Sequence, residues 1–143
     1  MKNKRKIILA GGSGYMGQAL QKHFSNLGDH VVILSRKNNA NSVYWDGKTI
    51  ANWTKELENA DILINLSGKS VDCRYTPKNK DLIMNSRVES TNILQEAMEK
   101  CPTPPSIWIN ASTATIYKGS KTIRMTEVHR EKLNDFSMTV DKN

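Results

Sequence analysis

The chain has 143 residues, of which 38% are hydrophobic and 24% are charged, and its formal net charge is +7. This length predicts one domain with a single core. No apolar stretch approaches the roughly 20 residues that a membrane helix needs, so we expect a soluble protein without a membrane span. The two cysteines, Cys73 and Cys101, show no metal-ligand spacing and predict free thiols in a reducing compartment, by default the cytoplasm.

The positive charge raises the question of nucleic-acid binding, because clustered lysine and arginine side chains attract phosphates. The cations are mostly dispersed, and only residues 2–6 form a run, which predicts a hydrated tail. The sequence shows no zinc-finger spacing and no basic-aromatic motif of the single-strand-binding kind. Nucleic acid is therefore the least favoured partner.

Four short apolar runs lack the alternation with polar residues that marks a half-exposed strand. They occupy residues 6–10, 31–34, 62–66 and 107–111. Such runs predict strands that are buried on both faces of a parallel sheet. Residues 42–46 form a weaker candidate for a further strand, third in chain order.

Two segments between these runs follow a helical period. The first ends at Gly28, a suitable C-terminal cap, and its apolar positions are Met16, Ala19, Leu20, His23, Phe24 and Leu27. The second covers about residues 78–100 and places Met84, Val88, Thr91, Leu94 and Met98 on one face. Alternating strands and helices predict right-handed crossovers and a doubly wound α/β sheet. Residues 118–134 are expected to form a loop, and residues 135–143 the start of another helix.

Four glycines, Gly11, Gly12, Gly14 and Gly17, lie between the first predicted strand and the first predicted helix. Glycine in regular structure costs about 0.5–1 kcal/mol relative to alanine, so the cluster needs a compensating reason. At a strand-to-helix turn, the spacing Gly12-x-Gly14-x-x-Gly17 is typical of a site that holds a dinucleotide pyrophosphate at the helix N-terminus. The alternative is a purely structural glycine turn. The predicted cofactor-binding residues here are Gly11, Gly12, Ser13, Gly14, Tyr15, Met16 and Gly17.

The end of the second predicted strand bears on which dinucleotide is bound. NAD-binding folds place an acidic side chain there, against the ribose 2′-hydroxyl. This chain instead has Ser35, Arg36 and Lys37. A guanidinium can pair with a 2′-phosphate and stack on adenine, so NADP(H) is favoured over NAD(H). The alternative is that the two cations are ordinary surface residues.

Several motifs, taken in chain order, together resemble a known family. They are Gly11–Gly17 (GGSGYMG), Leu34–Arg36 (LSR), Tyr44–Asp46 (YWD), Ala60–Gly68 (ADILINLSG), Asn85–Val88 (NSRV) and Asn110–Tyr117 (NASTATIY). The chain resembles the atypical branch of the extended short-chain dehydrogenase/reductases, which are epimerase-like and related to nucleoside-diphosphate-sugar epimerases. The resemblance implies a Rossmann-like doubly wound parallel sheet of about five strands, incomplete at the C-terminus.

The resemblance also implies roles for individual residues. The backbone of Leu66, Ser67 and Gly68 is expected to line the dinucleotide, although Gly68 could simply end a strand. Arg87 is expected near the adenosine half, with a solvated helix face as an equal alternative.

Further along the chain, Ser112 and Thr113 resemble the paired hydroxyls at the end of the fifth strand. Thr113 matches the catalytic serine or threonine and would hydrogen-bond a substrate carbonyl or alcohol during hydride transfer. The alternative is that these hydroxyls satisfy backbone groups where the strand ends.

The usual acid/base pair of this family is a tyrosine with a lysine four residues later, in which the cation lowers the pKa of the phenol. This chain has no such pair after Tyr117, and Tyr117 is the nearest substitute phenol. The absence of the tyrosine-lysine pair agrees with the atypical branch but leaves proton transfer unassigned.

Members of this family look roughly twice as long, so residues 1–143 are expected to form an NAD(P)-binding domain without the substrate lobe. The leading function is the NADP(H)-binding part of a reductase or sugar-nucleotide-epimerase-like protein that is inactive as this fragment. The alternative is a non-catalytic dinucleotide-binding module that acts through protein association. Homodimerisation through an exposed edge of the sheet is a further expectation.

Overall fold

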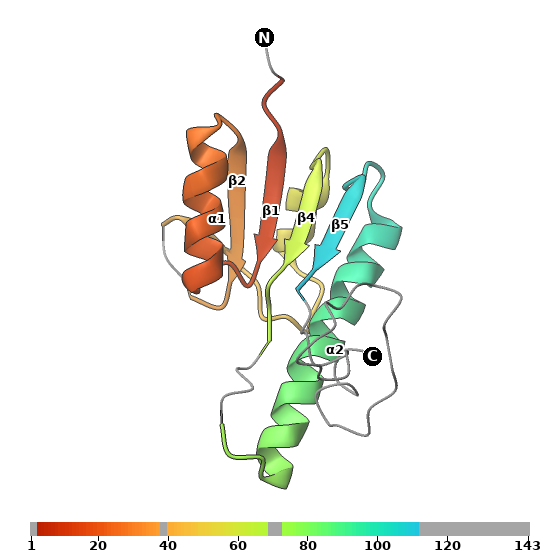
Figure 1. Cartoon of the computed structure of the whole chain (residues 1–143). Helices are drawn as coiled ribbons and strands as arrows, with labels where there is room; N and C mark the ends of the chain where they lie inside the picture. The colour runs from red at the N-terminus through yellow and green to blue at the C-terminus, as the bar shows by residue number, and fades with distance from the viewer. Residues whose placement is uncertain (1–2, 38–39, 69–72, 112–143) are drawn as a thin grey trace, which may run out of the picture.

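A computed structural model describes residues 3–37, 40–68 and 73–111 of the chain. Within them, five parallel strands form one sheet in the order β3-β2-β1-β4-β5 (Figure 1). The strands are β1 (Lys6–Ala10), β2 (His30–Ser35), β3 (Ser42–Tyr44), β4 (Ile62–Asn65) and β5 (Ile107–Asn110). Four lie at the predicted apolar runs and β3 lies within the weaker candidate 42–46, and β1 has the predicted bounds.

Two α-helices and one 3-10 helix connect the strands. They are α1 (Tyr15–Asn26), η1 (Asn52–Leu57) and α2 (Pro77–Lys100). Figure 1 shows α1 beside β2, whereas α2 runs past β5 and its first turns extend beyond the carboxyl ends of the strands. Each of these helices is too short or too polar to cross a membrane, as far as the described residues go.

Alternate residues of the strands face two separate layers of core. One layer joins Ile7, Leu9, Ile33 and Ile64 to side chains of α1, namely Leu20 and Phe24. The opposite layer joins strand residues such as Ile8 and Leu63 to η1 and α2, through Trp53, Leu57, Ile93, Leu94 and Ala97. Helices therefore cover both faces of a parallel sheet, and the predicted doubly wound, Rossmann-like α/β fold is confirmed.

The start of β1 is tied to the turn before β2 by an ion pair. The guanidinium of Arg5 donates to both carboxylate oxygens of Asp29, at 3.1 and 2.6 Å. The same guanidinium lies 5.9 Å from the ring centre of Phe24 in α1. Through these two contacts, Arg5 fixes the first strand, the first helix and the second strand relative to one another.

The two helices pack only part of their predicted apolar stripes against the sheet, and in α1 the predicted Leu20 and Phe24 do contact the core. In α1, Met16 and Leu27 are 59% and 54% exposed, and the buried helix residue is Gly17. The helix backbone packs so close to the preceding loop that a glycine, not a large apolar side chain, occupies the contact.

In α2, Leu94 is the predicted position that is fully buried; Met84, Val88, Thr91 and Met98 are only partly buried. The buried residues are Ile83, Ser90, Ile93, Leu94 and Ala97. Ser90 is 1% exposed, and its hydroxyl donates to the carbonyl of Arg87 at 3.0 Å. Because the polar Ser90 lies on the buried face, the apolar residues alone do not show which face of α2 is buried.

Two local differences concern the connection between β2 and β4. The third strand ends at Tyr44, two residues before the predicted end, because Asp46 begins a turn. The helix η1 has no apolar period and was not predicted from the sequence. It is held by Trp53, which is 1% exposed and donates its indole N–H to the carbonyl of Thr49 at 2.9 Å.

The predicted loop 118–134 and helix 135–143 lie outside the described residues.

Candidate functional site

A cavity of about 750 Å³ lies at the carboxyl edge of the sheet. The segments that follow β1, β2, β3 and β4 line it, together with one face of α2. The chain leaves β1 for β2 on one side and later returns to β4 on the other, so this is the point where the strand order reverses. Ligands of open α/β sheets bind in the crevice at such a switch point.

Three of the four glycines in the loop after β1 and the first turn of α1 are required by the packing of the protein itself. Gly11 has a φ of +72°, and a Cβ on it would lie 2.7 Å from the Cα of Ser67. A Cβ on Gly12 would lie 2.8 Å from the Cβ of Leu9, and one on Gly17 only 2.1 Å from the carbonyl oxygen of Gly12. These glycines bring the first loop, the first helix and the segment after β4 into close contact.

Gly14 is different, because a Cβ there would meet no protein atom within 4 Å. Its φ of −81° is accessible to any residue. It is the N-cap of α1, borders the cavity and provides no side-chain cap for the helix. The first turn also contains no acidic residue. The positive end of the helix and the N–H groups of its first turn therefore suit an anion that approaches Gly14 closely.

Cationic side chains border the cavity at the end of β2. Ser35 is buried, and its hydroxyl accepts a hydrogen bond from the backbone N–H of Lys37 at 3.0 Å. This bond turns the chain sharply after the strand, and the exposed residues Arg36 and Lys37 both line the cavity. Lys48 also lines it and forms an ion pair with Glu89 of α2, with 3.8 Å between Nζ and Oε2.

The segment after β4 approaches the glycine loop from the other side. Asn65 accepts hydrogen bonds at Oδ1 from the backbone N–H of Ser67, at 3.1 Å, and from its hydroxyl. Gly68 follows with a φ of +148°, and a Cβ on it would lie 3.0 Å from the guanidinium carbon of Arg87. Arg87 also donates to the carbonyl of Ile83 at 3.3 Å. The arginine therefore supports this segment from α2.

The segment after β3 forms a turn around Asp46. Its carboxylate accepts from the backbone N–H groups of Lys48 and Thr49, both at 2.9 Å, and from the Thr49 hydroxyl at 2.8 Å. Burial by itself raises the pKa of Asp46, but these three hydrogen bonds outweigh it and hold the pKa below its ordinary value. The ionised carboxylate therefore stabilises the turn that carries Gly47 and Lys48 along the cavity.

Nine of the fourteen predicted cofactor-binding residues line the cavity. They are Gly11, Ser13, Gly14, Ser35, Arg36, Lys37, Leu66, Ser67 and Gly68. The other five, Gly12, Tyr15, Met16, Gly17 and Arg87, do not line it. Gly12, Gly17 and Arg87 support the loops from behind, and Tyr15 is 91% exposed on the first turn of α1. The predicted catalytic residues Ser112, Thr113 and Tyr117 lie outside the described residues.

The cavity contains further residues that were not predicted to bind the cofactor. Four follow β3, namely Trp45, Asp46, Gly47 and Lys48, and five lie on α2, namely Leu82, Asn85, Ser86, Glu89 and Ser90. The α2 residues recur at spacings of three and four and so share one helix face. That polar spacing is the signal in the sequence that could have identified them. Within the described part of the chain, no group of histidine, cysteine, aspartate and glutamate side chains could hold a metal ion.

Comparison with known proteins supports the assignment of the cavity to a nucleotide-binding fold. Epimerase family protein YfhF of Bacillus subtilis (strain 168) is 35% identical over 137 residues, which cover 91% of this chain and 45% of that protein. Epimerase family protein SSP1921 of Staphylococcus saprophyticus is 31% identical over 135 residues, with the same 45% of its length covered. This chain therefore spans less than half the length of the curated relatives it matches.

Solved structures give the same result for the fold. The human epimerase family protein SDR39U1 (isoform 2), solved with NADPH, superimposes with a TM-score of 0.81 at 26% identity, over 94% of this chain and 45% of the human chain. A nucleoside-diphosphate sugar epimerase from Corynebacterium glutamicum gives 0.78 at 25% identity, over 98% and 29% of the two chains. A family model described as NAD dependent epimerase/dehydratase matches residues 7–138. This chain belongs to the NAD dependent epimerase/dehydratase family.

Proposed function

We propose that this chain is the NADP(H)-binding part of an epimerase-like reductase. The observation that carries the proposal is Gly14, which has open space around it at the N-terminus of α1, on the edge of the cavity. A dinucleotide pyrophosphate needs such a close approach to bare backbone N–H groups. The volume of about 750 Å³ lies within the range of small-molecule and cofactor sites. The similarity to a human protein solved with NADPH supports the same ligand class.

The preference for NADP(H) over NAD(H) rests on the end of β2. A 2′-hydroxyl is usually bound by a carboxylate, whereas a 2′-phosphate is bound by cations. The chain presents Arg36 and Lys37 at this point. The carboxylates among the described lining residues are Asp46 and Glu89, and both already have partners in the protein. Positive charge therefore dominates the part of the cavity where the adenosine ribose is expected.

The bound nicotinamide would supply or accept the hydride in the reaction of the whole protein. The described residues of this chain bind and orient: the first turn of α1 holds the pyrophosphate, and Arg36 holds the 2′-phosphate. The assignment of Thr113, with Ser112 and Tyr117, to the reacting substrate stays a prediction from the resemblance. The proposed activity of the isolated chain is therefore cofactor binding without turnover.

Calorimetric titration with NADPH and then NADH tests this proposal. The wild-type chain is expected to bind NADPH more tightly than NADH. Arg36→Ala should lose most of that preference, since a charge-assisted hydrogen bond of about 1.5–3 kcal/mol corresponds to roughly 10- to 100-fold in affinity. Lys22→Ala is the matched control, because Lys22 is an exposed cation of α1 that does not line the cavity. Equal affinities for the two nucleotides would overturn the preference, and no binding would overturn the function.

A second candidate function, association with another protein or a second copy of the chain, has one supporting observation. Ile107 and Ile109 of β5 are 50% and 48% exposed. Ile107 and Ile109 pair with Ile62 and Ile64 of β4 and so lie on the same face of the sheet. The helix α1 covers that face over β1 and β2. An exposed apolar edge favours association. Sedimentation should show a concentration-dependent homodimer that Ile109→Lys weakens; a monomer at every concentration would contradict this role.

A further inference from the structure

The side chain of Gln18 reaches back from the first turn of α1 to the loop that precedes the helix. Its amide nitrogen Nε2 donates to the carbonyl oxygen of Ser13 at 3.1 Å. Its backbone N–H donates to the carbonyl oxygen of Gly14 at 3.0 Å, which is the first hydrogen bond of the helix. One residue therefore holds two successive carbonyl groups of the loop, and both oxygens are turned toward α1.

The contact with Ser13 bears on the cavity. Ser13 and Gly14 line the cavity, whereas Gln18 is an exposed residue that does not line it. The peptide bond between Ser13 and Gly14 is trans, as are all peptide bonds of the described residues, so its C=O and N–H groups point in opposite directions. Because Gln18 holds the oxygen on the side of α1, this peptide does not direct a carbonyl oxygen at an anion beside Gly14.

The peptide before Gly14 needs such a contact, because little else holds it in place. Glycine lacks a Cβ, so the adjoining peptide can rotate at small cost. A Cβ built on Gly14 would meet no protein atom within 4 Å, whereas one on Gly11 or Gly17 would lie 2.7 or 2.1 Å from backbone atoms. Packing therefore fixes the loop at Gly11 and Gly17 but not at Gly14. A rotated peptide would turn the partial negative charge of the Ser13 oxygen toward the cavity and repel an anion there.

We propose that Gln18 is a positioning residue of the pyrophosphate site, which keeps the Ser13 carbonyl oxygen turned toward α1 and away from the bound phosphates. This inference rests on the proposed function, because the anion is the pyrophosphate of the dinucleotide. Gln18 does not touch the ligand and acts through the Ser13–Gly14 peptide. Its effect is therefore confined to the pyrophosphate and is independent of the 2′-phosphate contact at the end of β2.

The first test removes the amide donor. Methionine has a length and helix propensity similar to those of glutamine, so Gln18→Met changes little else. The dissociation constants of NADPH and NADH should rise about 3- to 10-fold, the value of one neutral hydrogen bond, and by the same factor because both ligands contain the pyrophosphate. Gln18→Ala should have the same effect, and the high helix propensity of alanine keeps this variant folded.

Gln21→Met is the matched control for these variants. It makes the same chemical change one turn later in α1, at a residue that does not line the cavity. Its dissociation constants for NADPH and NADH should equal those of wild type. An equal loss of affinity in Gln18→Met and Gln21→Met would contradict the proposal, because the loss would then come from the helix and not from the contact with Ser13.

A fragment without the pyrophosphate separates positioning from a general disturbance of the fold. Adenosine 2′-monophosphate carries the base, the ribose and the 2′-phosphate but no 5′-phosphate. Titration followed by nuclear magnetic resonance should give the same dissociation constant for wild type and Gln18→Met. Inorganic pyrophosphate should bind more weakly to the variant. If the variant loses as much affinity for adenosine 2′-monophosphate as for NADPH, Gln18 supports the fold as a whole and the proposal is wrong.

The carbonyl carbon of Ser13 reports the hydrogen bond itself. A carbonyl that accepts a hydrogen bond resonates downfield, so the ¹³C signal of Ser13 should move upfield in ligand-free Gln18→Met and stay in place in Gln21→Met. An unmoved signal in Gln18→Met would contradict the proposal. If wild type and both Gln18 variants bind NADPH equally well, this inference fails and the proposed function stands. If calorimetry detects no NADPH binding to wild type, both fail.

Discussion

A Cβ built on Gly17 would lie 2.1 Å from the carbonyl oxygen of Gly12. The first turn of α1 therefore touches the backbone of its own loop, and no side chain fits between them. Alanine is normally a better helix residue than glycine by about 1 kcal/mol. We nevertheless predict that Gly17→Ala lowers the free energy of unfolding by about 3 kcal/mol, because a backbone clash cannot be relieved by a rotamer change. Urea denaturation measures the change, and a stabilised variant would contradict the packing described here.

Gly14→Ala is the matched glycine variant. Its φ of −81° suits alanine, and the new methyl group would meet no protein atom within 4 Å. The free energy of unfolding should therefore stay within about 0.5 kcal/mol of wild type. Urea denaturation of the two variants side by side separates a glycine required by the fold from one that the fold does not require. A loss of stability as large as that of Gly17→Ala would show that Gly14 is structural.

The two buried tryptophans should respond differently to phenylalanine. Trp53→Phe leaves the carbonyl of Thr49 without its donor, whereas Trp45→Phe removes a donor that has no partner in the described structure. Both variants lose similar packing. In the absence of nucleotide we expect Trp53→Phe to be the less stable variant, by about 1 kcal/mol. Thermal unfolding of the two chains checks the order, and the reverse order would show that the Trp45 N–H is already paired.

The turn at Asp46 should make stability depend on pH. The pKa of this carboxylate is held below its ordinary value in the folded chain, so its contribution is present above the unfolded pKa of about 4 and is lost as the pH falls through the folded value. Asp46→Asn removes the charge but keeps the shape. The stability difference between wild type and this variant should be largest near neutral pH.

That difference should shrink as the pH falls below about 4, since protonated aspartic acid and asparagine are then both neutral. Denaturant unfolding of both chains across this range measures it. Asp81→Asn is a suitable control, because Asp81 is an exposed residue of α2 that does not line the cavity. A difference that is independent of pH would mean that the charge of Asp46 does not stabilise the turn.

The sequence predicts the sheet well because its strands are buried on both faces. Runs such as Ile7-Ile8-Leu9 cannot belong to a half-exposed strand, and their spacing leaves room for the crossover helices. The helix faces were less predictable. Gly17 and Ser90 are buried residues of α1 and α2, and neither residue contributes to an apolar period.

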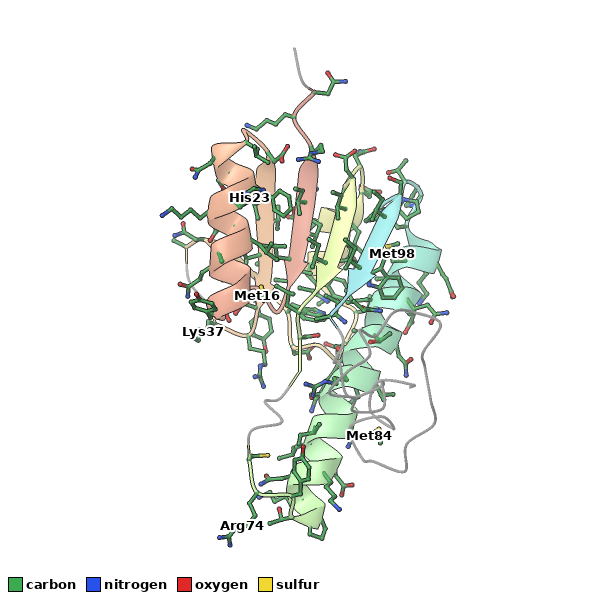
Figure 2. All side chains as sticks on the ribbon, in the orientation of Figure 1. Met16, His23, Lys37, Arg74, Met84 and Met98 are labelled. Carbon is green, nitrogen blue, oxygen red and sulfur yellow. The ribbon has the colours of Figure 1, made fainter. Side chains whose placement is uncertain are left out.

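The loops of the site were predictable for a related reason. The glycines and Ser35-Arg36-Lys37 follow directly after strands, where the topology brings all carboxyl ends to one edge. The contribution of α2 was not predictable. Asn85 and Glu89 line the cavity because the helix extends past the carboxyl ends of the strands (Figure 1), and this extension has no signal in the sequence. Figure 2 shows how the labelled Met84, also in the first half of α2, lies beyond the ends of the strands, while Met98 lies beside them. The unpaired N–H of Trp45 depends on tertiary packing and has no signature in the sequence.

The central claim is that the cavity beside Gly14 binds a nicotinamide dinucleotide. The most direct measurement is a calorimetric titration of NADPH into the wild-type chain and into Gly14→Ala, after urea denaturation has shown that both are folded. The account predicts saturable binding to wild type and an affinity at least about 10-fold weaker for the variant, because its methyl group occupies the space that the pyrophosphate needs. Equal binding by the two chains, or none by either, would contradict it.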